Sequence, residues 1–249
     1  MALSYQQKIA AYVLALYWPA LFVLAHIPIP RVVQEADVSD KSLHFLAYLI
    51  LIFLLRSVVS GNQKVNWRRA APWLVLFVIV VYGILDELLQ DYVGGRSCDI
   101  RDIFADLAGA FAGLIISSLL TFWPAGLLVV ATFIFGVTNV TRANLADLLP
   151  VTNVVFHLLA FAILTVLWIQ CMHLFLATKA PKAKWLILAL AGPTGFIIVL
   201  ILFSIITGKD FALSDIIISI GTITAVVVAF YLGALFRRIK DMESKDFSS

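Results

Sequence analysis

Charged and polar side chains gather between residues 86 and 106 of a chain that is otherwise strongly apolar. Placing a carboxylate at membrane depth costs roughly 2.5 to 3.5 kcal/mol on insertion scales, so such groups persist where they are paired, hydrated or functional. Together with a polar stretch at 41–48, this segment supplies our candidate ligand-binding residues. They are Lys41, His44, Tyr48, Asp86, Glu87, Gln90, Arg96, Asp99, Asp102 and Asp106. These residue types can bind hydroxyl, amine or phosphate groups, or a divalent cation.

The spacing of these residues predicts that each set lies on one face of a helix. Lys41, His44 and Tyr48 follow an i, i+3, i+7 pattern. The three aspartates at 99, 102 and 106 follow the same pattern. Asp86 and Gln90 are four residues apart, which is also one helical turn. The sets therefore need three helices that bring their polar ends together.

The composition indicates that these helices span a membrane. The 249 residues are 62% hydrophobic and 13% charged, with a mean hydropathy of +1.01, whereas a soluble domain carries about a quarter charged residues. Apolar runs of spanning length recur along the whole chain. We predict an all-α polytopic protein with about eight spans, at 9–28, 42–60, 71–92, 102–122, 125–141, 153–176, 185–206 and 213–236.

The distribution of charge predicts the orientation of these spans. Twelve of the 18 Lys and Arg residues fall on one side of the predicted topology. By the positive-inside rule that side is cytoplasmic, which places both termini in the cytoplasm. Span 2 then begins, span 3 ends and span 4 begins on the same outer face. We therefore expect the candidate residues to form one outward-facing polar pocket.

A shift of 113 residues aligns the two halves of the chain. His44 then falls on His157, and Asp102 falls on Asp215. We predict two four-helix repeats, 1–123 and 124–249, the second ending in a basic cytoplasmic tail. An even number of spans per repeat makes them parallel, with a pseudo-two-fold axis along the membrane normal.

The two predicted repeats differ in their polar residues. In the alignment, Lys41, Asp86, Glu87, Gln90 and Asp106 fall opposite Val154, Val199, Leu200, Phe203 and Ser219. A purely architectural need would apply to both halves. The difference therefore favours a functional role for the first set.

Several of these residues also have a simpler structural interpretation. Asp99 is well placed to cap the N-terminus of span 4, and Arg96 is placed to pair with a nearby carboxylate. For His44 two roles remain open: it makes a hydrogen bond that stabilises helix packing, or it faces a ligand. Gly109 and Gly113 form a GxxxG pattern, which is typical of close helix packing.

The segments DKSLHFLAYLIL and YGILDELLQDYVGGRSCDIRDIFADLAGAFAG together resemble the VanZ-like family over residues 10–122. Asp106 stands where we would expect Asn in that family. The resemblance implies a multi-pass protein of the bacterial cytoplasmic membrane. The founding member of the family is linked to resistance to the glycopeptide teicoplanin. The second half would be a diverged copy.

Three functions are open at this point. The first is a non-enzymatic protein that binds an envelope lipid or an amphiphilic glycopeptide and lowers glycopeptide susceptibility. The second is a metal-assisted hydrolase or transferase acting on an envelope lipid, in which the three aspartates at 99, 102 and 106 hold a divalent cation and Glu87 or His44 is the general base. The third is a lipid transporter, which is disfavoured because the polar groups gather at one end rather than at the midplane.

The sequence assigns no cofactor, no metal ligand set of the cysteine type and no nucleic-acid partner. Membrane lipids are the expected partners. The chain carries no pattern that indicates an oligomeric state.

Overall fold

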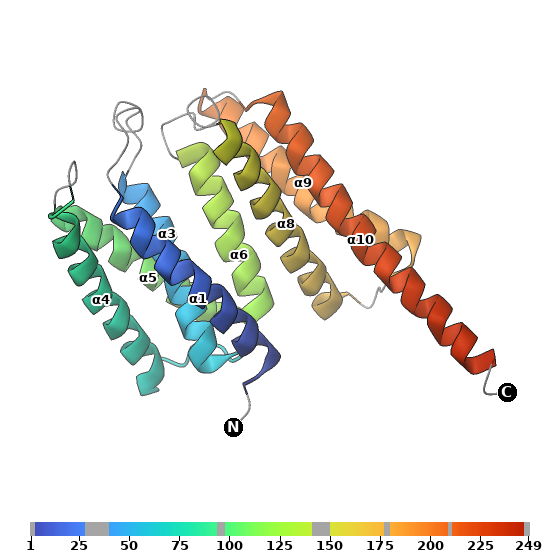
Figure 1. Ribbon diagram of the computed structural model, residues 1–249, viewed down its shortest axis with the longest axis horizontal. Helices are drawn as coiled ribbons and strands as arrows, with labels where there is room; N and C mark the ends of the chain where they lie inside the picture. Colours follow the sequence, from blue (N-terminus) through green and yellow to red (C-terminus); the bar gives the residue numbers. More distant parts are fainter. Residues whose placement is uncertain are drawn as a thin grey trace. The chain divides into compact units, whose positions relative to one another are not determined.

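The computed structural model describes residues 3–27, 40–93, 98–140, 150–176, 180–208 and 211–246. Within these ranges every regular element is a helix (Figure 1). The helices are α1 (Tyr5–Ala25), α3 (Asp40–Ser60), α4 (Ala70–Gln90), α5 (Ile100–Leu119), α6 (Phe122–Phe135) with the π-helical η1 (Gly136–Val140), α8 (Pro150–Phe175), α9 (Ala183–Ile206) and α10 (Leu213–Asp246). Eight of the helical segments in the described ranges are long and apolar enough to cross a membrane, α6 and η1 counting as one. The predicted all-α polytopic architecture is confirmed.

Two helix ends lie four or more residues outside the predicted spans, the start of α1 and the end of α10. Helix α1 begins at Tyr5, because the Ser4 side chain accepts a hydrogen bond from the Gln7 amide and the Gln7 side chain accepts one from the Ser4 amide. This capping box satisfies two amides that a helix start leaves without partners. Helix α10 continues to Asp246 through the segment predicted as a tail.

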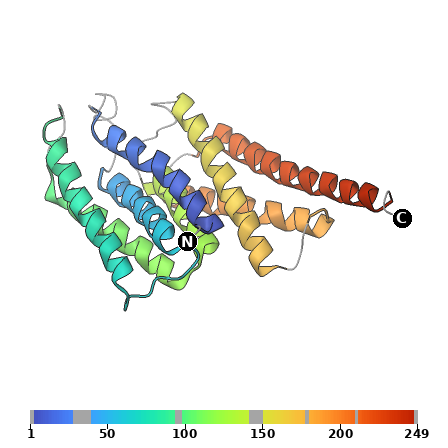
Figure 2. The same cartoon turned by 60° about the horizontal axis from the view of Figure 1, so that its bottom comes forward.

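The chain divides into two compact units, Met1–Asn144 (unit 1) and Leu145–Ser249 (unit 2). In unit 1, α3 is the central helix and contacts α1, α4, α5 and α6. Figures 1 and 2 both show α1 alongside α3. In unit 2, α8, α9 and α10 contact one another. Unit 1 extends past residue 123 because α6 packs on α3 and α5, while the repeat boundary between 123 and 124 stays a prediction.

Glycines let α3 and α5 approach closely. A Cβ atom added at Gly109 would overlap the backbone carbonyl of Phe45, and one added at Gly113 would overlap the Ile52 side chain. Small residues at such positions allow two helix backbones to pack against each other. The predicted packing role of Gly109 and Gly113 is thus confirmed. The close approach aligns the polar start of α3 with the polar start of α5.

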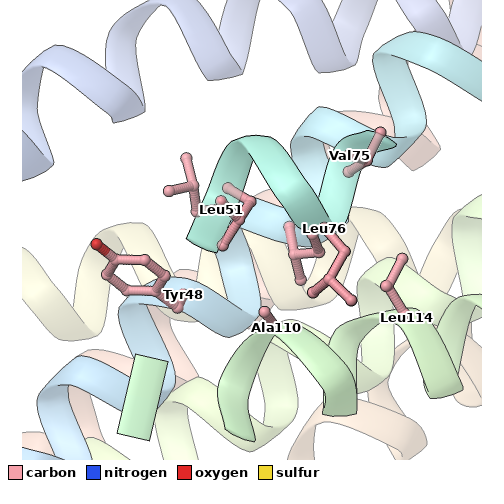
Figure 3. Packing of buried hydrophobic residues seen from close by; sticks show 8 residues of the cluster. Tyr48, Leu51, Val75, Leu76, Ala110 and Leu114 are labelled. Atoms are coloured by element: carbon pink, nitrogen blue, oxygen red, sulfur yellow. The ribbon is translucent and has the colours of Figure 1, made fainter. Parts of the chain in front are cut away.

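Unit 1 has an apolar core directly below its polar end. Tyr48, Leu51, Val75, Leu76, Ala110 and Leu114 are buried members of one cluster. Figure 3 shows the Tyr48 ring at one edge of this cluster, with its hydroxyl pointing away from the apolar side chains. Tyr48 therefore lies at the boundary between the core and the polar groups.

Candidate functional site

The start of α3 and the start of α5 are joined by an ion-paired lysine. The Nζ atom of Lys41 donates to Asp99 Oδ2 and to Asp102 Oδ1, each at 3.1 Å. The Lys41 side chain is 45% exposed, whereas that of Asp102 is only 7% exposed. Lys41 thus covers a buried carboxylate from the solvent side.

One turn deeper, a second pair joins the same two helices. His44 Nδ1 donates to Asp106 Oδ1 at 3.0 Å, and both side chains are at least 90% buried. Tyr48 lies one further turn along α3, where its hydroxyl and Asp106 Oδ2 both border Gly83 of α4. The i, i+3, i+7 face predicted for 41–48 therefore faces the acidic side of α5.

The end of α4 adds two buried carboxylates. Asp86 Oδ2 accepts a hydrogen bond from Gln90 Nε2 at 2.8 Å, as their spacing predicts. Glu87 Oε1 accepts from the backbone amide of Asp99 at 2.7 Å, which ties the end of α4 to the residue before α5. The two carboxylates are 4% and 1% exposed. We call the described residues Lys41, His44, Asp86, Glu87, Gln90, Asp99, Asp102 and Asp106 the polar cluster.

Asp99 is the N-cap of α5, as the sequence predicts. Its Oδ1 accepts a hydrogen bond from the Arg101 amide at 2.9 Å. This bond, together with the hydrogen bond from Lys41, lowers the pKa of Asp99 below its ordinary value. Arg96, Gly94 and Gly95 lie outside the described residues, so their predicted roles stay predictions.

Two residues that the sequence analysis did not name as candidates, His26 and Tyr82, also approach the polar cluster. His26 ends α1, donates from Nδ1 to the Phe22 carbonyl at 2.8 Å and lies 3.8 Å from Asp86 Oδ1. The Tyr82 hydroxyl of α4 is buried, and its ring packs edge-on against Trp18. The sequence feature that could have identified His26 as part of the site is its position at the end of the first span, on the predicted outer face.

Several buried polar atoms of the site have no hydrogen-bond partner among the described residues. They are His26 Nε2, Asp86 Oδ1 and Glu87 Oε2, together with Tyr48 Oη, Tyr82 Oη and Asp106 Oδ2. In this second group the Tyr48 hydroxyl lies beside Asp106 and the Tyr82 hydroxyl beside Asp86, so Glu87 Oε2 is the clearest acceptor without a partner. Most buried polar atoms in folded proteins are hydrogen-bonded, so a group of orphaned ones needs an explanation. Carboxylates also outnumber the basic groups that pair with them in this part of the chain. A donor or a positive charge that the described residues do not supply would satisfy these atoms.

Three members of the polar cluster are close enough to share a cation. His44, Glu87 and Asp102 each offer one ligand atom, and these atoms lie within 4.8 Å of one another. This set differs from the predicted trio Asp99, Asp102 and Asp106. Asp99 and Asp102 share Lys41 instead, and Asp106 is bonded to His44.

An apolar groove of about 540 Å³ lies along α1, with Val58 of α3 and Tyr82 of α4 completing its wall. It is lined by Leu14, Trp18, Phe22, Val23 and Tyr82, among others. Phe22 stacks on His26 with ring centroids 4.2 Å apart, and Tyr82 carries one of the orphaned hydroxyls. The groove therefore borders the polar cluster on its α1 side.

Unit 2 carries a smaller polar network at the positions that the 113-residue shift predicts. His157 Nδ1 donates to or accepts from Ser219 Oγ at 3.0 Å, in the place of the His44–Asp106 pair. Asn153 Nδ2 donates to Asp215 Oδ1 at 2.8 Å. The polar contact between the two helices is thus present in both units, but the dense group of carboxylates is described only in unit 1.

Residues 7–122 match the family model described as VanZ/LLP1. The VanZ/LLP1 match agrees with the resemblance predicted from the two segments and contains every residue of the polar cluster. It ends at the start of α6, so unit 2 lies outside it. No curated protein matches the chain, and no solved structure does. Residues 7–122 are thus similar to the VanZ/LLP1 family, and the eight apolar helices in the described ranges make the chain a multi-pass membrane protein.

Proposed function

We propose that the polar cluster binds the head of an envelope lipid or of an amphiphilic glycopeptide, and that this binding lowers glycopeptide susceptibility. In this proposal the protein lies in the bacterial cytoplasmic membrane with both termini in the cytoplasm, so the cluster opens outward. The observation that carries the proposal is the group of buried carboxylates, above all Glu87, whose Oε2 atom has no hydrogen-bond partner among the described residues.

The chemistry of the cluster favours a head that donates hydrogen bonds. Lys41 is engaged by Asp99 and Asp102, so the groups that remain for a ligand are mainly carboxylate and hydroxyl oxygens. Leaving a buried acceptor unsatisfied costs about 1–3 kcal/mol, which a ligand hydroxyl or amine would recover. A sugar or an amine supplies such donors.

The apolar groove supports an amphiphile rather than a small polar ligand. Its wall residues Trp18 and Phe22 would contact an acyl chain. Phe22 also touches His26, which lies beside Asp86 of the cluster. A ligand with an acyl chain in the groove and its head on the carboxylates would satisfy both surfaces.

The aligned position in the second half supports a functional interpretation of Glu87. Leu200, which falls opposite Glu87, is fully buried, while Glu87 is 1% exposed. Burial at this position is therefore compatible with an apolar side chain. We propose that the two units derive from a tandem duplication in which only the first copy keeps the ligand-binding carboxylates, and the matching His157–Ser219 contact supports it.

The proposal is tested by titrating purified full-length protein with teicoplanin and, in parallel, with a glycopeptide that lacks an acyl chain. Glu87→Gln should weaken teicoplanin binding about tenfold or more, because one charged acceptor is lost. Asp215→Asn in unit 2 is the matched control and should bind like wild type. The glycopeptide without the acyl chain should bind more weakly to every variant. Equal affinities of Glu87→Gln and wild type would reject the cluster as the binding site.

We propose as a second candidate a metal-assisted hydrolase or transferase, because His44, Glu87 and Asp102 can share a divalent cation. The orphaned Glu87 Oε2 fits this donor set, since carboxylate oxygen and imidazole nitrogen suit Mn²⁺ or Zn²⁺. The cation would supply positive charge for a lipid phosphate. Metal analysis of the purified protein tests it: one bound divalent ion, lost in Asp102→Asn, supports this candidate, and its absence after incubation with Mn²⁺ and Zn²⁺ rejects it.

A further inference from the structure

A second cavity lies at the opposite end of unit 1, far along α3 from the polar cluster. It has a volume of about 590 Å³ and is bordered by the start of α1, the end of α3, the connection 61–69 and the start of α4. Its polar lining includes Arg56, Asn62, Gln63, Lys64, Asn66 and Arg69. None of the described lining residues is acidic. The cavity is thus basic where the cluster at the other end is acidic.

Arg56 is a buried guanidinium without a counter-ion in the described part of the chain. The residue is 1% exposed. Its Nη1 donates to the Gly61 carbonyl at 3.4 Å, while Nε and Nη2 have no hydrogen-bond partner among the described residues. Buried charges in proteins are normally paired because an isolated one is costly. A guanidinium offers donors in a planar fork that matches phosphate oxygens.

The N-terminus of α4 adds a second anion-binding feature. Arg69 is the N-cap of this 21-residue helix, and no side chain caps it. Ala71 and Pro72 of the first turn line the cavity, and of the two only Ala71 offers a backbone N–H, because proline has none. Uncapped amides and the positive end of the helix dipole both favour an anion at this position.

The cavity walls are fixed by hydrogen bonds to neighbouring helices. Asn62 Oδ1 accepts from the Phe122 amide at 3.2 Å, and the Val65 amide donates to the Ser117 carbonyl at 2.9 Å. Gln7 Nε2 donates to the Val58 carbonyl at 2.9 Å. A site whose walls are already held loses less conformational entropy when a ligand binds.

We propose that this cavity binds a phosphate group, held by Arg56 with Lys64, Arg69 and the Ala71 amide at the start of α4. The site lies on the side that the sequence predicts to be cytoplasmic. Its ligand is the head of an anionic phospholipid or a soluble phosphate compound, because both present the same oxygens. The proposal is independent of the function proposed for the polar cluster.

Two arms of one experiment distinguish the two sources. In detergent, thermal unfolding of the full-length protein is measured in inorganic phosphate and in chloride at equal ionic strength. In nanodiscs of phosphatidylcholine with a minor fraction of phosphatidylglycerol, the lipids retained by the protein are identified by native mass spectrometry. Stabilisation by phosphate without selective lipid retention indicates a soluble ligand, and selective retention of phosphatidylglycerol indicates a lipid head.

The variant Lys64→Gln/Arg69→Gln changes exposed side chains and should weaken either form of binding about tenfold or more. Arg68→Gln is the matched control, because Arg68 is basic and adjacent but does not line the cavity. Arg56→Met should abolish the phosphate effect and raise the melting temperature in chloride, since a buried unpaired charge is removed. Absence of both phosphate stabilisation and selective lipid retention in wild type overturns the proposal, and so does equal loss in Arg68→Gln.

Discussion

Replacing Gly109 by alanine should separate α3 from α5 and so disturb the site from a distance. The added Cβ would overlap the Phe45 carbonyl, and a backbone atom cannot rotate away as a side chain can. Overpacking a well-packed interior costs about 1–3 kcal/mol, and we place Gly109→Ala at or above the upper end of this range. Because the starts of the same two helices carry Lys41 and Asp102, the ion pair between them should weaken as well.

Two other glycines provide a graded series. The obstacle nearest to Gly113 is the Cγ2 methyl of the buried Ile52. This side chain can shift only slightly because it is β-branched, so Gly113→Ala should cost about 1–3 kcal/mol and less than Gly109→Ala, whose nearest obstacle is backbone. Among the residues that the structure describes, no atom lies within 4 Å of a Cβ added at Gly221 in α10. Gly221→Ala should therefore stabilise its helix by about 0.5–1 kcal/mol.

The assay is reversible unfolding of the purified protein in mixed micelles, followed by its helical circular dichroism. From most to least stable, the expected order is Gly221→Ala, wild type, Gly113→Ala and Gly109→Ala. If Gly109→Ala were as stable as Gly221→Ala, α3 and α5 would not pack as closely as described. The inference that their contact aligns the polar cluster would then be wrong.

Two further predictions concern charges in the cluster. A double-mutant cycle on His44 and Asp106 should give a coupling free energy of about 1–3 kcal/mol, because both side chains are buried. The same cycle on Lys41 and Asp99 should give less than about 1 kcal/mol, since the Lys41 side chain is 45% exposed. Equal coupling free energies for the two pairs would contradict this ranking. Because the pKa of folded Asp99 is lowered, its stabilising effect is complete above the ordinary aspartate pKa and is lost as the pH falls through the lower folded pKa. Wild type should therefore lose melting temperature more steeply in that window than Asp99→Asn, and parallel curves would refute a role for its charge.

The helices and their polar faces were predictable because they depend on local patterns. Apolar runs of spanning length gave all eight spans, and the i, i+3, i+7 spacing placed Lys41, His44 and Tyr48 on one face. Asp99 was predictable as an N-cap from its place before an apolar run. The capping box of Ser4 and Gln7, which starts α1 early, was also present in the sequence as S-x-x-Q.

The pairing within the site depends on the distance and rotation between helices, which no local pattern specifies. The sequence therefore could not tell that Lys41 is shared by Asp99 and Asp102, or that Asp106 is bonded to His44 and leaves a different set for a cation. The sequence predicts Arg56 only as one of the basic residues on the cytoplasmic side, because no local pattern indicates that its side chain is buried. The orientation of the spans and the pseudo-two-fold axis stay predictions, since they concern the membrane and the relation of the two units.

The most direct test of the central claim is native mass spectrometry of the full-length protein gently purified from its membrane, with identification of retained lipids. We predict that wild type and the unit 2 control Asp215→Asn retain an envelope lipid with a sugar or amine head. Glu87→Gln should reach the same membrane level and melt like wild type but lose that lipid. Identical lipid profiles for wild type and Glu87→Gln, or failure of Glu87→Gln to fold, would contradict the account and make the polar cluster a structural network.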